Sequence, residues 1–137
     1  MAARELAVGT PLEPFVIESV DPQRMKTMVA ILRDPNPIHY DTEVTRRLGL
    51  GDRPVNQGPI NLTWMVEAVA RFAGGPKRLR DIEVRFLGNV FAGERFECTG
   101  RVSSIDAAAG TAEIEVTATA DGRDVLSGTA TVAVGGQ

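Results

Sequence analysis

The stretch RDPNPIH, residues 33 to 39, holds the only histidine of the chain and an aspartate five positions before it. A carboxylate and an imidazole that face one water molecule can share the removal and the delivery of protons. The imidazole suits the first task, because its pKa can lie near neutrality. The two prolines exclude a helix, so the chain must curl, and proline and asparagine hold such a turn in one conformation. A single loop histidine beside prolines is more often structural, but Asp34 and His39 together raise the hypothesis of an acid–base pair.

The start of the longest predicted helix offers a second chemical group. This helix covers residues 58 to 73, GPINLTWMVEAVARFA, with a proline at its first turn and Gly74-Gly75-Pro76 after its end. Apolar residues cover most of its circumference, so we expect it to be buried on nearly all sides. Free N–H groups and the positive end of the helix dipole at such an N-terminus can stabilise an oxyanion. Pro59 has no N–H, which makes the Gly58 amide the better candidate donor.

Two shorter helices are predicted before the long one. The first begins at Asp21-Pro22, which is typical of an N-cap followed by a first-turn proline, and carries apolar residues at helical spacing. The prolines of the RDPNPIH loop end it, because a residue that precedes proline is disfavoured in the helical region. The second is expected over residues 42 to 48, with Asp41 as N-cap and Gly49 as a left-handed C-cap.

After residue 80 the apolar pattern changes to a period of two, which predicts half-buried strands. Four strands are expected, within residues 81 to 86, 95 to 102, 113 to 120 and 126 to 134, and we expect them to form an antiparallel meander. A short strand within residues 10 to 19 adds to them. Phe86 and Cys98 fall on the inward faces, where Cys98 is interpreted as a small core residue rather than a nucleophile.

An apolar helix and an antiparallel sheet have a natural packed solution, in which the sheet wraps its apolar face around the helix. This arrangement is the α+β hot-dog fold, and we expect residues 1 to 137 to form one such domain. A lone sheet of this kind leaves edges and one end of the helix uncovered, so a second subunit is expected. Trp64 and Met65 are then interpreted as core or dimer-contact residues in preference to a wall of the substrate pocket.

Composition argues against several classes of protein. The net charge of −3, with dispersed Lys and Arg, gives no electrostatic case for nucleic acid. The longest apolar stretch, residues 62 to 73, is interrupted by Glu67 and Arg71 and is far short of a membrane span. The N-terminus has no apolar run of signal-peptide type. One cysteine and one histidine exclude an internal disulfide and make a zinc site improbable. We therefore expect a cytoplasmic protein that holds no metal.

The segments DPNPIHYD and VNQGPINLTW resemble the MaoC-like hydratase/dehydratase family, which carries the pattern Asp-x-Asn-Pro-Ile-His. In order and spacing the resemblance extends over residues 10 to 134. It implies a hot-dog fold and a hydro-lyase that interconverts trans-2-enoyl and (R)-3-hydroxyacyl thioesters. The acyl carrier would be coenzyme A or acyl carrier protein, whose phosphopantetheine is part of the substrate, so no separate cofactor is expected.

Carried over residue by residue, the resemblance places the catalytic pair on Asp34 and His39. Asn36 would hold the loop through its amide rather than contact the substrate. The Gly58 amide would stabilise the enolate oxygen of the thioester. Thr63 matches a position where related enzymes often carry a serine near the catalytic water, although it could equally be an ordinary buried hydroxyl bonded to a carbonyl.

Three residues depart from the family pattern. Arg33 occupies a position where a small residue, often glycine, commonly precedes the aspartate. Gln57 replaces a frequent histidine, and Pro59 replaces an apolar residue such as methionine. The last two adjoin the predicted oxyanion site, so they bear on rate and substrate shape more than on the type of reaction.

Two alternatives remain open. Hot-dog thioesterases usually rely on a carboxylate on or near the central helix, where Glu67 is the only acidic residue and has the spacing for a pair with Arg71. Some family members are heterodimers in which one chain lacks the catalytic pair. This chain has the pair, so it would be the catalytic half, and a homodimer is the simpler expectation.

Three basic residues follow the long helix. Lys77, Arg78 and Arg80 could bind coenzyme A phosphates or an acidic carrier protein, but a solvated strand edge is the favoured interpretation.

Overall fold

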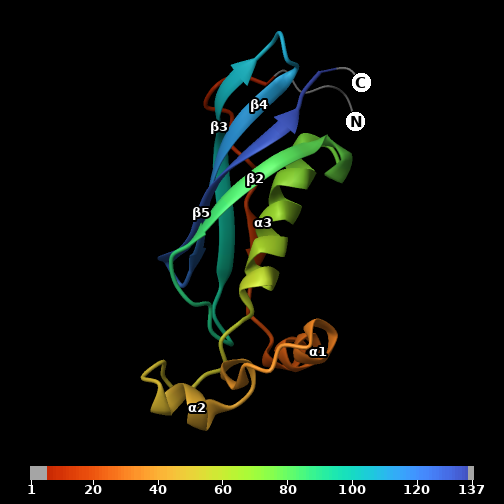
Figure 1. Ribbon diagram of the computed structural model, residues 1–137. Helices are drawn as coiled ribbons and strands as arrows, with labels where there is room; N and C mark the ends of the chain where they lie inside the picture. The colour runs from red at the N-terminus through yellow and green to blue at the C-terminus, as the bar shows by residue number, and fades with distance from the viewer. Residues whose placement is uncertain (1–5, 136–137) are drawn as a thin grey trace.

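A computed structural model describes residues 6 to 135 and shows a five-stranded antiparallel sheet curved around helix α3, Gly58–Ala73 (Figure 1). The strands follow the order β1-β3-β4-β5-β2 across the sheet. This is the hot-dog architecture that the apolar helix and the alternating strands predicted. The bounds of the strands are β1 Phe15–Ile17, β2 Leu79–Phe86, β3 Phe96–Asp106, β4 Thr111–Ala120 and β5 Arg123–Ala133.

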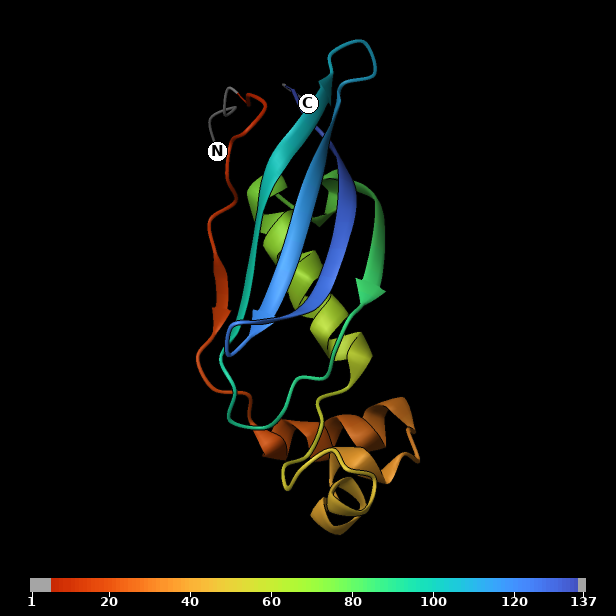
Figure 2. The ribbon, with the colours of Figure 1, turned by 90° about the vertical axis from the view of Figure 1, so that its left-hand side faces the viewer.

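The strand order differs from the predicted meander. Only β3, β4 and β5 follow one another as neighbours, whereas β2 pairs with β5 and β1 pairs with β3. The residues expected to form a turn between β2 and β3 instead form a long connection that passes the N-terminal end of α3 (Figure 2). The prediction was wrong because alternation within a strand identifies its apolar face but not its neighbours.

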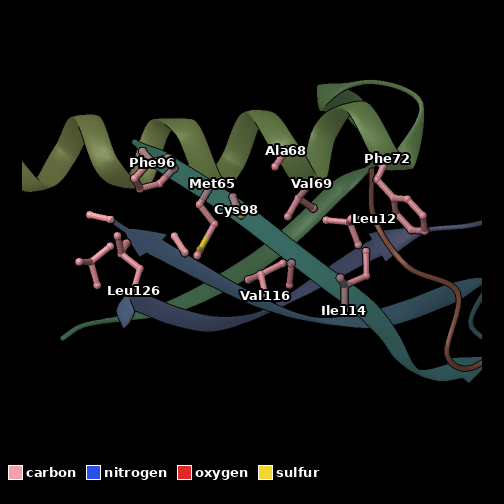
Figure 3. Close-up of a cluster of buried hydrophobic side chains, with 14 of the residues drawn as sticks. Leu12, Met65, Ala68, Val69, Phe72, Phe96, Cys98, Ile114, Val116 and Leu126 are labelled. Atoms are coloured by element: carbon pink, nitrogen blue, oxygen red, sulfur yellow. The ribbon is translucent and has the colours of Figure 1, made fainter. Parts of the chain in front are cut away.

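Side chains of α3 pack into the concave apolar face of the sheet (Figure 3). Met65 and Val69 of the helix and Phe96 and Cys98 of β3 have no exposed surface. The Trp64 ring packs against Phe96 with 4.9 Å between ring centroids. Burial raises the pKa of the Cys98 thiol to about 12, so Cys98 stays protonated and serves as a small core residue, as its position in the alternation predicted.

Two glycines allow the backbones of neighbouring strands to approach closely where the sheet curves. Gly100 on β3 and Gly128 on β5 flank Val116 of β4 in one row. A Cβ at Gly100 would collide with the carbonyl oxygen of Glu115, and a Cβ at Gly128 would collide with that of Glu83. Neither glycine has a positive φ. Close backbone approach, rather than backbone conformation, therefore excludes a side chain at both positions.

Helix α3 is less enclosed in the single chain than its composition predicted. Pro59, Thr63, Glu67 and Arg71 recur every four residues and form an exposed stripe. Arg71 Nε lies 2.8 Å from Glu67 Oε1, in the i+4 pair that the spacing suggested. The sheet covers only one side of α3 (Figure 1), so the expectation of burial on nearly all sides is wrong for this chain by itself.

A layer of short helices lies across the end of the molecule where α3 begins (Figure 2). It consists of α1, Pro22–Leu32, the 3-10 helix η1, Pro37–His39, and α2, Thr42–Arg47. As predicted, Asp21 caps α1 by accepting a 2.9 Å hydrogen bond from the Gln23 N–H. Asp41 caps α2 in the same way through the Glu43 N–H, at 3.0 Å. This layer carries the RDPNPIH loop and presents it at the N-terminal end of α3.

Candidate active site

Asp34 and His39 lie side by side. The Asp34 Oδ2 atom is 3.0 Å from His39 Nε2. His39 is buried, with 6% of its surface exposed, whereas 30% of the Asp34 side chain is exposed. The structure therefore brings together the two residues that the sequence singled out, and solvent reaches one of them.

The second ring nitrogen of His39 sets the tautomer. Nδ1 is 2.6 Å from the Val55 carbonyl oxygen, and because that oxygen can only accept, Nδ1 carries the hydrogen. Nε2 is left to face Asp34. A hydrogen bond between Nε2 and the carboxylate then needs one further proton on either atom. A carboxylate and an imidazole at this distance can exchange a proton, which is the property that acid–base catalysis requires.

Local hydrogen bonds hold the loop that joins the two residues. Asn36 is the N-cap of η1, and its Oδ1 accepts from the Ile38 N–H at 3.2 Å. The Oδ1 atom of Asp34 accepts from the Asn36 N–H at 3.0 Å. One oxygen of the Asp34 carboxylate thus binds the loop backbone while the other faces His39. Local turns bring the two residues together, and the more distant Val55 carbonyl oxygen then orients the imidazole.

Arg33 ends α1 in the left-handed region, with φ 50° and ψ 41°. Its N–H donates to the Val29 carbonyl oxygen as the helix cap. This conformation costs a residue with a Cβ about 1 to 2 kcal/mol, whereas glycine adopts it freely. Arg33 therefore adopts this conformation at a cost that a glycine would avoid.

We expect Arg33→Gly to keep the fold and to raise the free energy of unfolding by at most about 1 kcal/mol, because relief of strain is partly offset by the freer unfolded chain. Arg33→Ala removes the same side chain but retains a Cβ, so it should be less stable than Arg33→Gly. Urea denaturation of the three proteins measures the difference. If Arg33→Ala proved the more stable variant, the left-handed conformation would not be the source of the cost.

The N-terminus of α3 keeps one free N–H group, because Pro59 has none and those of Ile60 and Asn61 donate to the Gln57 carbonyl oxygen. Gly58 is the first helical residue, so its N–H has no acceptor within the helix. Gln57 is the N-cap residue but makes no side-chain capping bond. Its buried side chain instead donates from Nε2 to the Met25 carbonyl oxygen at 2.9 Å, while Oε1 has no partner. Gln57 therefore ties α1 to the start of α3 and leaves the first turn available to another acceptor.

Phe86 is exposed, which corrects its expected place on the inward face of β2. It is the last residue of the strand, and 56% of its surface is accessible. A Cβ built on Gly58 would come within 3.3 Å of its ring. Phe86 therefore lies against the start of α3 instead of in the core, at the point where β2 ends. Glycine at residue 58 allows the close contact.

Thr63 lies on the exposed stripe of α3, and its hydroxyl donates to the Pro59 carbonyl oxygen at 2.7 Å. The expected bond to a carbonyl is thus present, but the expected burial of Thr63 is not. Two asparagines near the start of α3, Asn56 and Asn61, are buried, and Asn56 Nδ2 donates to Asn61 Oδ1 at 2.7 Å. The sequence analysis missed this amide pair, although a polar residue inside an apolar helix is a signal that could have drawn attention to it.

A cleft with a volume of about 870 Å³ lies between β1, α1 and the first turns of α3. Ile60, Thr63 and Trp64 line it from the central helix, so Trp64 is both a core residue and part of this wall. Asn56 also lines the cleft, one residue after the carbonyl that binds His39. Asp34 and His39 are not among the lining residues. The cleft thus reaches the residue that follows Val55 but not the pair itself.

The arginines that follow α3 bind carbonyl oxygens of the backbone. Arg78 and Arg80 donate to the carbonyl oxygens of Gly135 and Lys77, at 3.1 and 2.6 Å, which fits a solvated edge. Within residues 6 to 135, no group of three or more His, Cys, Asp or Glu side chains is arranged to hold a metal ion. In the same range, none of the helices has the length and apolar character needed to cross a membrane.

The protein thus combines a hot-dog sheet around a central helix with an Asp–His loop at the start of that helix. The chain belongs to the family described as MaoC like domain, whose model matches residues 7 to 124. No curated protein sequence matches the chain.

Solved structures share the fold at low sequence identity. The (R)-hydratase from A. caviae involved in PHA biosynthesis is 18% identical, with a TM-score of 0.84 over 97% of this chain and 100% of that one. R-hydratase PhaJ1 from Pseudomonas aeruginosa is 18% identical, with a TM-score of 0.82 over 97% and 84% of the two chains. A chain of the ChsH1-ChsH2 complex from Mycobacterium tuberculosis is also 18% identical, with a TM-score of 0.80 over 94% and 98%. These similarities show the fold that the chain shares with them.

Proposed function

We propose that this protein is a hydro-lyase that interconverts trans-2-enoyl and (R)-3-hydroxyacyl thioesters carried on coenzyme A or acyl carrier protein. The observation that carries the proposal is the 3.0 Å contact between Asp34 Oδ2 and His39 Nε2. Membership of the MaoC-like family supports it. Two proteins of similar fold are named as (R)-hydratases.

Hydration of a conjugated thioester forms a bond between the water oxygen and C3, removes one proton from that water and adds one proton to C2. The Asp34–His39 pair can accept the first proton and deliver the second, so it ends the cycle as it began. His39 is suited to the water proton, because the hydrogen bond to Val55 commits Nδ1 and leaves Nε2 to react. Asp34 would orient the water and pass a proton toward C2.

The developing negative charge on the thioester oxygen needs a donor. The Gly58 N–H is the proposed donor, since it starts α3 and has no acceptor in the helix. Phe86, whose ring lies against Gly58, and Thr63, whose hydroxyl donates to the Pro59 carbonyl oxygen, are close to that first turn and would contact the substrate. The cleft between α1 and α3 has room for an acyl chain.

We further propose that the working form is a dimer, either of two identical chains or with another hot-dog subunit. Strand β2 pairs only with β5, so one of its edges is unpaired in the described chain. The exposed stripe of α3 and the exposed Phe86 are further surfaces that a partner would cover. One protein of similar fold is named as a member of a two-component complex.

The direct test incubates purified protein with trans-2-enoyl-CoA esters of several chain lengths and follows the loss of the conjugated thioester absorbance. We expect turnover with a kcat/KM of about 10⁴ M⁻¹s⁻¹ or more on the preferred ester, and a product of (R) configuration by chiral chromatography. The same acyl groups on acyl carrier protein would identify the carrier. Absence of hydration for every ester on both carriers, with a dimeric folded protein, would contradict the proposal.

A thioesterase is the second candidate, and a thiol reagent in the same assay separates it. Its expected carboxylate, Glu67, lies on the exposed stripe of α3 and is paired with Arg71. This arrangement favours the hydro-lyase. Release of free coenzyme A that disappears in Glu67→Gln and persists in His39→Gln would instead support the thioesterase.

A further inference from the structure

A buried carboxylate lies in the connection between β2 and β3, outside the Asp34–His39 pair. Glu94 is 1% exposed, and Arg123 at the start of β5 binds it through two nitrogens, at 2.6 and 3.0 Å. The Oε1 atom of Glu94 also accepts from the Phe91 N–H at 2.7 Å. Burial alone would raise the pKa of Glu94, but the hydrogen bonds from Arg123 and Phe91 and the charges of Arg123 and Arg53 lower it overall. Glu94 is therefore an ionised group held by fixed partners.

Two guanidinium groups fasten the connection that contains Glu94. Arg123 Nη2 donates to the Asn89 carbonyl oxygen at 3.0 Å, and Arg53 Nη1 donates to the Ala92 carbonyl oxygen at 3.3 Å. Both groups also lie over the Phe91 ring, with 5.4 Å from Arg53 and 5.9 Å from Arg123 to the centroid. Residues 89 to 94 thus have a fixed shape although they form no regular strand.

This connection in turn positions the backbone that binds His39. Val55 forms an isolated antiparallel bridge with Phe91. The Asn56 N–H donates to the Val90 carbonyl oxygen at 2.7 Å, and the Ala92 N–H donates to the Pro54 carbonyl oxygen at 3.0 Å. Residues 54 to 56 therefore take their place from residues 90 to 92. The carbonyl oxygen of Val55, held in this way, is the acceptor for His39 Nδ1.

We propose that Glu94 and Arg123 are positioning residues for His39, and this inference rests on the proposed hydro-lyase function. The ion pair fixes the connection, the connection fixes the Val55 carbonyl, and the carbonyl sets the tautomer and orientation of the imidazole. A buried ion pair is by itself a weak source of stability compared with packed apolar side chains. Its effect here is on the geometry of a general base, where a displacement of about 1 Å can cost roughly 10²-fold in rate.

The test compares Glu94→Gln with Val132→Ala. Glutamine keeps the shape of the side chain and an acceptor for the Phe91 N–H, but loses the charge that binds Arg123. Val132 is fully buried in β5, where it pairs with Leu79 and Ala112 at the other end of the strand from Arg123, so its truncation lowers the Tm without touching the connection. We expect kcat for enoyl-CoA hydration to fall by about 10²-fold in Glu94→Gln and to stay within about 3-fold in Val132→Ala, with KM little changed in both.

A second readout does not depend on activity. His39 is the only histidine, so the nitrogen signals of a single imidazole report its tautomer by nuclear magnetic resonance. We expect one protonated Nδ1 signal in the wild type and in Val132→Ala, and a mixture of tautomers in Glu94→Gln. Should Glu94→Gln fail to fold, Arg123→Lys keeps the charge but loses the two-nitrogen contact, and is expected to change the same signals.

A folded variant with an unchanged kcat and an unchanged imidazole signal would overturn the inference. If the wild-type protein hydrated no enoyl thioester, the proposed function would fail, while the imidazole signals would still decide whether Glu94 and Arg123 position His39.

Discussion

Replacement of His39 by glutamine is expected to lower kcat for enoyl-CoA hydration by about 10³-fold and to leave the fold intact. Glutamine can still donate to the Val55 carbonyl oxygen, which His39 Nδ1 binds at 2.6 Å, but it cannot take a proton from water. KM should change little, because the imidazole is buried and contributes more to proton transfer than to binding. Steady-state kinetics and circular dichroism on the purified variant provide the measurement.

Asp34→Asn should cause a loss of similar size. Its amide oxygen can accept from the Asn36 N–H as Asp34 Oδ1 does, so the loop keeps its shape while the carboxylate disappears. The two replacements should combine with much less than additive effect, because the residues act as one unit.

Asp41→Asn is the matched control for Asp34→Asn. It also removes a carboxylate near the loop, but Asp41 caps α2 through the Glu43 N–H, a role that asparagine fills equally well. Its kcat should stay within about 2-fold of the wild type, as expected for a group without a part in proton transfer. Wild-type rates in both Asp34→Asn and His39→Gln would remove the pair from the mechanism.

Replacement of Gly128 by alanine is expected to reduce the free energy of unfolding by about 1 to 3 kcal/mol, or to prevent folding. The added Cβ would collide with the Glu83 carbonyl oxygen, which belongs to the backbone of the neighbouring strand and cannot rotate away. Relief would require β2 and β5 to separate at the centre of their ladder, where the strand hydrogen bonds lie. Thermal or urea denaturation measures the loss.

Gly88→Ala is the matched control, because it makes the same chemical change without the collision. An added Cβ there would meet the Asp124 carbonyl oxygen at 3.7 Å, which is ordinary contact, and Gly88 has no positive φ. Its free energy of unfolding should stay within about 0.5 kcal/mol of the wild type. Equal stability of Gly128→Ala and Gly88→Ala would show that the sheet is less tightly curved than its backbone indicates.

Features encoded within a few residues could be predicted from the sequence. The bounds of α3 agree with the prediction, because Pro59 and Gly74 act on the backbone where they stand. The caps at Asp21 and Asp41 were identified for the same reason. The convergence of Asp34 and His39 also follows from a short, proline-rich turn, whose geometry depends on its own residues.

Features that depend on distant segments could not be predicted. The alternation of β2 was clear, yet its place beside β5 and the exposure of Phe86 follow from contacts across the fold. Neither Glu94, buried against Arg123, nor the Val55 carbonyl that orients His39 has any local signal in the sequence.

The helices, the strands and the identity of the candidate acid–base pair could thus be identified from the residues alone, since turns, caps and periodicity act over a few residues. The order of the strands, the groups that hold the imidazole and the uncovered side of α3 became known from the folded chain. These depend on which of several compatible long-range contacts form together, a choice made by the packing of the whole chain.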